Sequence, residues 1–226
     1  MFNQVPARYD LMNRLLTLRL DELWRKKAVK LCLENNPEKI IDICTGTGDL
    51  AIRLSKAVKG SKSIEALDFS QPMLNTAQFK SSKKKIVNIN FVLGDVAELP
   101  YPDNTWDSMG IGFAFRNLTY KNPKTDLYLP EILRVLKKNG RFVIAETCQP
   151  DSGVVKILYH LYMRILVGTI GGWLSGHRAA YRYLARSAIH FYNAEEVREL
   201  LLETGFSKVE VYKQMGGVAA VYVAVK

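Results

Sequence analysis

The sequence predicts an α/β fold whose sheet is doubly wound, mostly parallel and seven-stranded, and ends in an antiparallel β-hairpin. Apolar runs of strand length alternate with helix-like segments from residue 38 to residue 147, which is the pattern of βαβ units with right-handed crossovers. A helix-like segment at 194–205 precedes two strand-like runs that meet at Gly216-Gly217, as in a closing hairpin. With 226 residues, 48% of them hydrophobic, the chain can bury one substantial core, and we expect a single domain over 1–226.

Hydrophobic periodicity and the residues that begin or end helices place the individual elements. Apolar residues at helical spacing, without internal Pro or Gly, predict a helix over 8–34 within an N-terminal helical segment, 1–36. Pro72 suits the first turn of a helix, and Asn139-Gly140 ends another. The expected helices lie at 8–34, 49–58, 72 onward, 125–138 and 194–205. The expected strands lie at 38–44, 63–70, 89–95, 106–115, 141–147, 207–215 and 218–226.

Residues 151–193 break this alternation and predict a helical insertion that acts as a lid over the active-site edge of the sheet. In "VVKILYHLYMRILVGTIGGWL" the polar residues Lys156, His160 and Arg164 recur at every fourth position, which places one basic stripe on an otherwise apolar helix. These charges argue against a membrane-spanning segment. An amphipathic lid in peripheral contact with an anionic membrane surface fits the pattern, as does an ordinary helix packed on the core.

Composition favours a cytoplasmic protein, with peripheral contact to the inner face of the membrane. The opening "MFNQVPARYD" lacks a basic region followed by an apolar run, so it is not a secretory signal. The three cysteines, Cys32, Cys44 and Cys148, lack the spacing of a metal site, and we expect reduced thiols and no metal. A net charge of +10 suits nucleic acid, an anionic membrane or an acidic substrate. No aromatic residues interrupt the basic run "KSSKKK" at 80–85, so we interpret it as a solvated loop and expect no nucleic-acid partner.

The segment "IIDICTGTGDLA", 40–51, leads from a strand through a glycine turn into a helix, as in nucleotide-binding folds. Gly46, Thr47 and Gly48 form the turn, and Asp68 ends the next strand, where a carboxylate accepts hydrogen bonds from ribose hydroxyls. This much fits a dinucleotide and S-adenosylmethionine equally. The carboxylates Asp42 and Asp49 flank the turn.

Those carboxylates decide between the two nucleotides. A pyrophosphate needs the free N–H groups and positive end of the helix after the turn. A like charge at about 4 Å would cost on the order of 4 kcal/mol at an effective dielectric constant near 20. The ammonium and sulfonium of S-adenosylmethionine are instead stabilised by carboxylates. Asp95, at the end of the third strand, adds an acceptor for the adenine amine. The sequence therefore predicts S-adenosylmethionine as cofactor, S-adenosylhomocysteine as product, and the class I methyltransferase fold.

The residues after the fourth strand narrow the choice of methyl acceptor. Methylation of planar amino nitrogens would favour an Asn/Asp-Pro-Pro-aromatic turn there, where this chain has "GIGFAFRN", and no metal-ligand cluster supports catechol O-methylation. A methyltransferase acting on RNA or on a small phenolic or lipid acceptor stays open, as does a noncatalytic cofactor-binding module. RNA binding with a steep salt dependence would distinguish the first of these.

Longer motifs make the chain resemble the ubiquinone/menaquinone biosynthesis C-methyltransferase family over nearly its whole length. They are "ARYDLMNRLLTLRLDELWRK", "FAFRNLT", "EILRVLKKNGRFVIAE", "YRYLARSAIHFYNAEEVRELLLETGF" and the closing hairpin. The resemblance implies C-methylation of a polyprenylated quinol, demethylmenaquinol or a ubiquinol precursor, and is compatible with a homodimer. It also implies that Thr47, Asp68, Asp95, Val96 and the backbone of Gly112 line the cofactor pocket.

The chain departs from the family mainly at the acceptor end. Ala114 stands where the family usually has glycine, Tyr120 stands where it often has an acid, and "GHRAA" precedes "YRYL" where an acid is common. These departures leave open which quinone, or which related phenolic lipid, is methylated.

Catalysis is expected from Arg116, with Asn117 and Tyr9 beside it. A ring carbon attacks a methyl group well only when its quinol hydroxyl is losing a proton, so the pocket must stabilise a phenolate. Arg116 follows the fourth strand, at the edge where doubly wound sheets bind ligands, and its guanidinium stays charged. We expect Arg116 to hold the oxyanion and polarise a water that takes the proton, and Asn117 and Tyr9 to orient the ring oxygens. His177 and His190 are reserve bases.

Overall fold

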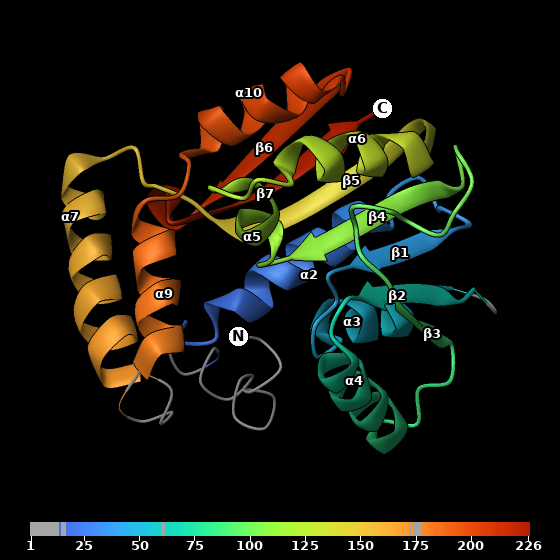
Figure 1. The fold of residues 1–226 in the computed structure, drawn as a ribbon, viewed down its shortest axis with the longest axis horizontal. Coiled ribbons are helices and arrows are strands. Elements are labelled where there is room, and N and C mark those ends of the chain that lie inside the picture. Colours follow the sequence, from blue (N-terminus) through green and yellow to red (C-terminus); the bar gives the residue numbers. More distant parts are fainter. Residues whose placement is uncertain (1–13, 15–16, 60–61, 172, 174–177) are drawn as a thin grey trace.

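The computed structural model describes residues 14, 17–59, 62–171, 173 and 178–226, and they form the expected mixed α/β architecture around one seven-stranded sheet (Figure 1). The strand order is β3-β2-β1-β4-β5-β7-β6. The first five strands are parallel, and β7 runs antiparallel to both β5 and β6. The strands are β1 (Ile40–Ile43), β2 (Ile64–Asp68), β3 (Ile89–Leu93), β4 (Trp106–Gly112), β5 (Leu136–Thr147), β6 (Lys208–Gln214) and β7 (Ala219–Val225).

Helices bury apolar residues against both faces of this sheet. On one face of the sheet, apolar residues of α2 and α3 pack against side chains of β1, β2, β5 and β7. On the other face, apolar residues of α5, α6 and α10 pack against side chains of β1, β4, β5 and β7. The described helices are α2 (Leu20–Cys32), α3 (Asp49–Ala57), α4 (Gln71–Lys83), α5 (Phe115–Thr119), α6 (Thr125–Val135), α7 (Gly153–Tyr162), α9 (Arg178–Ile189) and α10 (Ala194–Thr204), with a π-helix η2 (Met163–Gly171) and a 3-10 turn η3 (Met215–Gly217).

Three boundaries differ from the sequence prediction. The helix expected over 8–34 is interrupted in its described part, because Leu18 and Arg19 have left-handed backbone angles (φ 51° and 63°) and α2 begins only at Leu20. The expected strand over 106–115 ends at Gly112, since Phe113 also has a positive φ of 62°, and the short helix α5 follows. The helix expected over 125–138 ends at Val135, because the extended residue Leu136 starts β5.

The inserted segment lies at the end of the sheet to which the parallel strands point. Here α7 and α9 stand side by side beyond α5 (Figure 1). They share a small core of their own with η2, centred on Tyr159, Met163, Val167, Tyr181 and Ala185. This segment therefore faces the sheet edge at which ligands of doubly wound sheets bind.

Candidate active site

A cavity of about 920 Å³ opens at the carboxyl ends of the parallel strands. One half is lined by the glycine turn after β1 and by the acids that end β2 and β3, and the other by apolar side chains of α7, η2 and α9. Arg116, Asn117 and Glu146 line the same cavity. The cavity thus joins a polar compartment to an apolar one large enough for a drug-sized ligand.

The glycine turn has the geometry that only small residues allow. Gly46 (φ 55°) and Gly48 (φ 80°) both adopt left-handed backbone angles. A Cβ on Gly48 would lie 2.9 Å from Cβ of Ala77, whereas a Cβ on Gly46 would meet nothing within 4 Å. Gly48 therefore lets α3 pack against α4, and Gly46 leaves its backbone open to a ligand in the cavity.

Asp68 holds the turn against the end of β2. Its Oδ2 accepts a hydrogen bond from the amide of Gly46 (2.8 Å), and its Oδ1 accepts one from the amide of Ser70 (2.9 Å). Burial raises the pKa of this carboxyl, although the backbone N–H groups oppose the shift. Carboxylate oxygens accept more than one hydrogen bond, so Asp68 keeps capacity for hydroxyls in the cavity that it lines.

One carboxylate oxygen of Asp42 accepts hydrogen bonds, and the other has no hydrogen-bond partner among the described residues. Its Oδ2 accepts hydrogen bonds from Oγ1 of Thr45 (2.5 Å) and from the amide of Ala51 (3.0 Å). Its Oδ1 is buried without a hydrogen-bond partner among the described residues. Burial raises the pKa of Asp42 to about 7, against the lowering effect of those two donors. An unpaired buried acceptor in a cavity wall is a site for a cationic donor.

Asp49 lies close to basic side chains that balance its charge, which the sequence did not lead us to expect. Its Oδ1 lies 2.5 Å from Nζ of Lys80 and 3.8 Å from Nη2 of Arg14, and Lys80 also donates to Oγ1 of Thr47 (3.0 Å). Burial would raise the pKa of Asp49, but the cations Lys80, Arg25 and Arg14 together outweigh it and the pKa is lowered. Because its charge is balanced, Asp49 repels a phosphate less than the sequence suggested. Asp42 carries that argument, because its hydrogen bonds within the described part of the chain come from the neutral donors Thr45 and Ala51.

The third strand contributes the far wall of the polar half. Asp95 is exposed, accepts a hydrogen bond from the amide of Ala97 (3.0 Å), and lies 3.4 Å from Nζ of Lys124. Val96 is buried beside it, and both line the cavity together with Gly112. The described residues predicted to contact the cofactor therefore line this one cavity, except Gly48, which packs against α4 instead.

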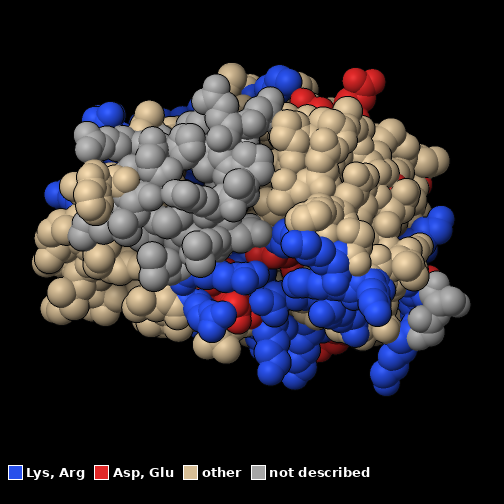
Figure 2. Space-filling view, turned by 90° about the horizontal axis from the view of Figure 1, so that it is seen from below, with Lys and Arg blue, Asp and Glu red and all other residues tan. Residues whose placement is uncertain are grey.

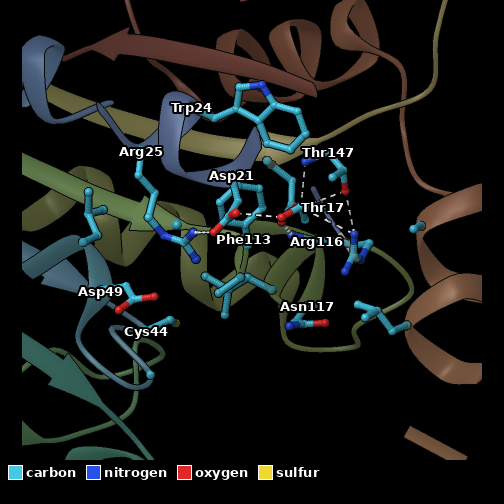
Figure 3. Close-up of a pocket in the computed structure, with 18 of the residues that line it drawn as sticks. Thr17, Asp21, Trp24, Arg25, Cys44, Asp49, Phe113, Arg116, Asn117 and Thr147 are labelled. Atoms are coloured by element: carbon cyan, nitrogen blue, oxygen red, sulfur yellow. Dashed lines mark hydrogen bonds and ion pairs between the residues drawn. The ribbon is translucent and has the colours of Figure 1, made fainter. Parts of the chain in front are cut away.

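Arg116 is a buried side chain in an ion pair rather than a free cation (Figure 3). Its Nη1 donates to Oγ1 of Thr147 (2.8 Å) and lies 3.4 Å from Oε1 of Glu146. Its Nε is buried without a hydrogen-bond partner among the described residues. Asn117 follows on α5 and lines the same cavity. The geometry brings together Arg116 and Asn117 and adds a carboxylate that the sequence prediction lacked.

The other predicted acid–base residues are not placed in the cavity. Tyr9 and His177 lie outside the described residues. His190 is exposed, with Nδ1 2.7 Å from the carbonyl oxygen of Arg186, and does not line the cavity. No group of three or more His, Cys, Asp and Glu side chains in the described part of the chain could hold a metal ion.

Helix α2 supplies a wall that the sequence did not indicate. Asp21 accepts hydrogen bonds from Arg25 and from Oγ1 of Thr17 (2.6 Å), and the Arg25 guanidinium lies 4.6 Å from the ring centre of Phe113 (Figure 3). All four line the cavity. Charged residues spaced i, i+4 on a helix usually indicate a surface pair, so only the fold reveals that this pair faces a cavity.

Comparison with known proteins places this arrangement in a family. The whole chain, residues 1–226, matches the model of the ubiE/COQ5 methyltransferase family. It is 38% identical over 224 residues to a demethylmenaquinone methyltransferase of Thermus thermophilus, covering 99% of this chain and 98% of that protein. It is 36% identical over 225 residues to one of Staphylococcus carnosus, covering 100% and 91%.

Solved structures agree on the fold. A putative S-adenosylmethionine-dependent methyltransferase from Methanococcus maripaludis superposes with a TM-score of 0.67 at 22% identity, covering 100% of this chain and 94% of that one. One from Aquifex aeolicus gives a TM-score of 0.62 at 22% identity, covering 89% and 88%. The predicted class I methyltransferase fold and the predicted family are thus confirmed, and the chain belongs to the ubiE/COQ5 methyltransferase family of S-adenosylmethionine-dependent enzymes.

Proposed function

We propose that this protein transfers a methyl group from S-adenosylmethionine to a ring carbon of a polyprenylated quinol, with demethylmenaquinol as the preferred acceptor. The observation that carries the proposal is one cavity lined by carboxylates, by apolar side chains and by Arg116. The relatives named demethylmenaquinone methyltransferases, at 38% and 36% identity, support that choice over a ubiquinol precursor.

The polar half fits the cofactor residue by residue. The orphaned Oδ1 of Asp42 suits the ammonium of the methionine moiety, and Asp68 suits the ribose hydroxyls. Asp95 suits the adenine amine, with Val96 packed beside the ring. Gly46, Thr47 and Gly112 line the same half, and Gly48 holds the turn against α4. When bound, the cofactor supplies an electrophilic methyl group on a sulfonium.

The apolar half suits a prenylated ring. Arg116 and Asn117 would meet the ring oxygens, with Tyr9 as a third proposed contact outside the described residues. Leu158, Met163 and Val167 line the part of the cavity beyond them, where an isoprenoid tail would be shielded from water. We propose that residues 151–193 act as the lid of this compartment within one methyltransferase domain.

The outer face of the lid carries exposed apolar and basic side chains, which support contact with a membrane through insertion of the apolar groups as well as through charge. Val154, Ile157, Leu161 and Ile165 of α7 and η2 are each at least half exposed. Lys156 and Arg164 are exposed beside them, and His160 lies between them, half-buried, with its Nε2 2.7 Å from Oε1 of Gln149. No acidic residue occurs from 152 to 193. Such a basic, apolar surface suits an anionic bilayer.

A second basic surface surrounds α4, which faces the viewer in Figure 2. Lys83, Lys84 and Lys85 are exposed there, as the sequence predicted, but the solvated loop expected over 80–85 is wrong in its first part, because residues 80–83 belong to α4 and Lys80 pairs with Asp49. Burial first, and then the nearby cations Lys56 and Lys80, lower the pKa of Lys84. None of the helices in the described part of the chain has the length and hydrophobicity to cross a bilayer. We therefore propose a cytoplasmic protein in peripheral contact with the membrane.

Vesicle sedimentation tests this contact. Anionic vesicles should bind the protein at low salt and release most of it at high salt. Ile157→Asp should weaken binding, whereas Leu127→Asp, at a similarly exposed leucine of α6, should not. If neutral vesicles bound the protein as strongly as anionic ones, charge would be excluded as a cause of binding. If light scattering showed a dimer in the parent protein that Ile157→Asp loses, this face would be assigned to a homodimer interface.

Labelled S-adenosylmethionine tests the proposed activity. The protein should transfer label to a reduced prenylated quinol in a membrane lipid extract, and total RNA should receive none. Labelled RNA, or label in another phenolic lipid, would replace the proposed acceptor. Cofactor binding without any labelled product would indicate a noncatalytic module.

A further inference from the structure

Glu146 is a buried carboxylate that lines the cavity beside Arg116. It is 1% exposed and occupies the next-to-last position of β5. Its role is not assigned by the cofactor contacts proposed above. We propose that Glu146 accepts the proton of the quinol hydroxyl, relayed through the hydroxyl of Thr147; this inference rests on the proposed quinol substrate.

The contacts of Glu146 and Thr147 form a path from the cavity to a buried base. Oγ1 of Thr147 lies 3.1 Å from Oε1 of Glu146, to which it donates, and accepts from Nη1 of Arg116 at 2.8 Å. Thr147 is only partly buried, and both residues line the cavity. A ring hydroxyl beside Arg116 would therefore meet the Thr147 hydroxyl before the carboxylate. A hydroxyl both donates and accepts, so it can pass a proton on.

Backbone contacts hold Glu146 in this position. Its Oε2 accepts from the amide of Arg116 (3.1 Å), and its Oε1 accepts from the amide of Thr147 (2.9 Å). The carboxylate is thus fixed by the start of α5 and the end of β5, the two elements that also carry Arg116 and Thr147. A base on rigid elements keeps its geometry as the proton moves.

The charges of the buried groups favour proton transfer to Glu146 over a mechanism in which Arg116 and a water molecule act alone. Arg116 and Glu146 are 5% and 1% exposed and form an ion pair, so a phenolate next to them would add an unbalanced negative charge. If the proton moves to Glu146, the negative charge moves from the carboxylate to the ring oxygen. Arg116 then remains paired throughout, and the buried net charge does not change. Such fixed electrostatics stabilise a developing oxyanion.

The proton count balances with this path. The quinol O–H proton passes to Oγ1 of Thr147 as the Thr147 proton passes to Glu146. The ring carbon forms a bond to the methyl group while the methyl–sulfur bond breaks and leaves its electron pair on sulfur. The ring carbon then loses its hydrogen as a proton to solvent, and Glu146 returns its proton to the ring oxygen. The net products are the methylated quinol, S-adenosylhomocysteine and one proton.

Neighbouring groups are poorer acceptors. Burial raises the pKa of the Tyr159 hydroxyl, although the charge of Arg116 opposes the shift, so Tyr159 stays protonated near neutral pH and does not serve as the base. His160 interacts with Gln149 and does not line the cavity. Among the described cavity-lining acids, Glu146 is the one paired with Arg116.

Glu146→Gln tests the relay through its pH dependence. The variant should lose about 10²–10⁴-fold in kcat at pH 7, the usual range for removing a general base. A phenol ionises near pH 10, so the spontaneous phenolate increases about tenfold per pH unit, and the deficit should shrink accordingly between pH 7 and 9. A deficit that is equal at every pH would mean that Glu146 only positions Arg116, and would overturn the proposal.

Two further sets of variants keep the test decisive if Glu146→Gln folds poorly. Thr147→Val preserves the Arg116–Glu146 pair and should show the same pH-dependent deficit, and Thr147→Ser should be faster than Thr147→Val. A parent-like rate in Thr147→Val would overturn the relay. Glu131→Gln breaks an ion pair with Arg134 (2.7 Å) outside the cavity and should match the parent at each pH. A parent enzyme that methylates no quinol would instead overturn the proposed function.

Discussion

Protonation of Asp42 should control cofactor affinity near neutral pH. The carboxyl is buried, its Oδ1 has no partner among the described residues, and its pKa is raised to about 7. If Oδ1 accepts the ammonium of the cofactor, only the ionised form binds well. Lowering the pH from 8 to 5 is therefore the perturbation, because it neutralises Asp42 without changing the ligand's ammonium.

The expected magnitude depends on the ionised fraction. With a pKa of about 7, roughly nine-tenths of Asp42 is ionised at pH 8 and about one-hundredth at pH 5. Apparent affinity scales with the binding-competent fraction, so affinity should fall roughly a hundredfold over this range. Binding at pH 6 should also release a proton from Asp42.

The same raised pKa affects the stability of the ligand-free protein in the opposite direction, favouring low pH. Between the ordinary pKa of 3.8 and about 7, the folded state holds this proton more firmly than the unfolded chain does. The contribution of Asp42 to stability therefore falls as the pH rises through that window.

Titration calorimetry with S-adenosylhomocysteine in two buffers of different ionisation enthalpy measures both affinity and proton release. Asp42→Asn should bind weakly and with the same affinity at pH 5 and pH 8. An affinity of the parent protein that is constant over this range, or an Asp42→Asn variant that keeps the pH dependence, would refute the assignment.

Three further outcomes are expected. Asp68→Ala should weaken S-adenosylhomocysteine binding by about 1–3 kcal/mol in calorimetry, while NAD should not bind; NAD binding would contradict the choice of cofactor. Arg116→Ala should keep cofactor affinity and lose about 10²–10³ in turnover, with little recovery in Arg116→Lys, and a parent-like rate would exclude Arg116 from the mechanism. Gly48→Ala should lower the melting temperature, because its Cβ would lie 2.9 Å from Cβ of Ala77; an unchanged melting temperature would show that α4 can shift.

Local signals in the sequence predicted the sheet and the polar half of the cavity. Strand-length apolar runs predicted all seven strands, and Gly46 with Asp42 and Asp68 lines the cavity as the glycine turn and the strand-end acids suggested. These features depend on residues close in the chain or on parallel strands ending at one edge. Such relations can be derived from periodicity and topology alone.

The acceptor half could not be predicted in the same way. Glu146 lies near the end of an apolar strand and gives no local sign of its contact with Arg116, which lies 30 positions earlier in the chain. The break before α2 depends on left-handed backbone angles at Leu18 and Arg19, residue types that rarely adopt them. The partner of Asp49, Lys80, comes from a different helix. Each of these depends on tertiary contacts that no short motif encodes.

The position of the transferred methyl group is the most direct test of C-methylation. Demethylmenaquinol would be kept reduced, incubated with the protein and with S-adenosylmethionine labelled in its methyl carbon, and the product examined by NMR. We predict a labelled methyl group bonded to a ring carbon next to a hydroxyl-bearing carbon, with no label on oxygen. A labelled methyl ether, or no labelled quinol while S-adenosylhomocysteine binds normally, would contradict C-methylation of a quinol by this protein.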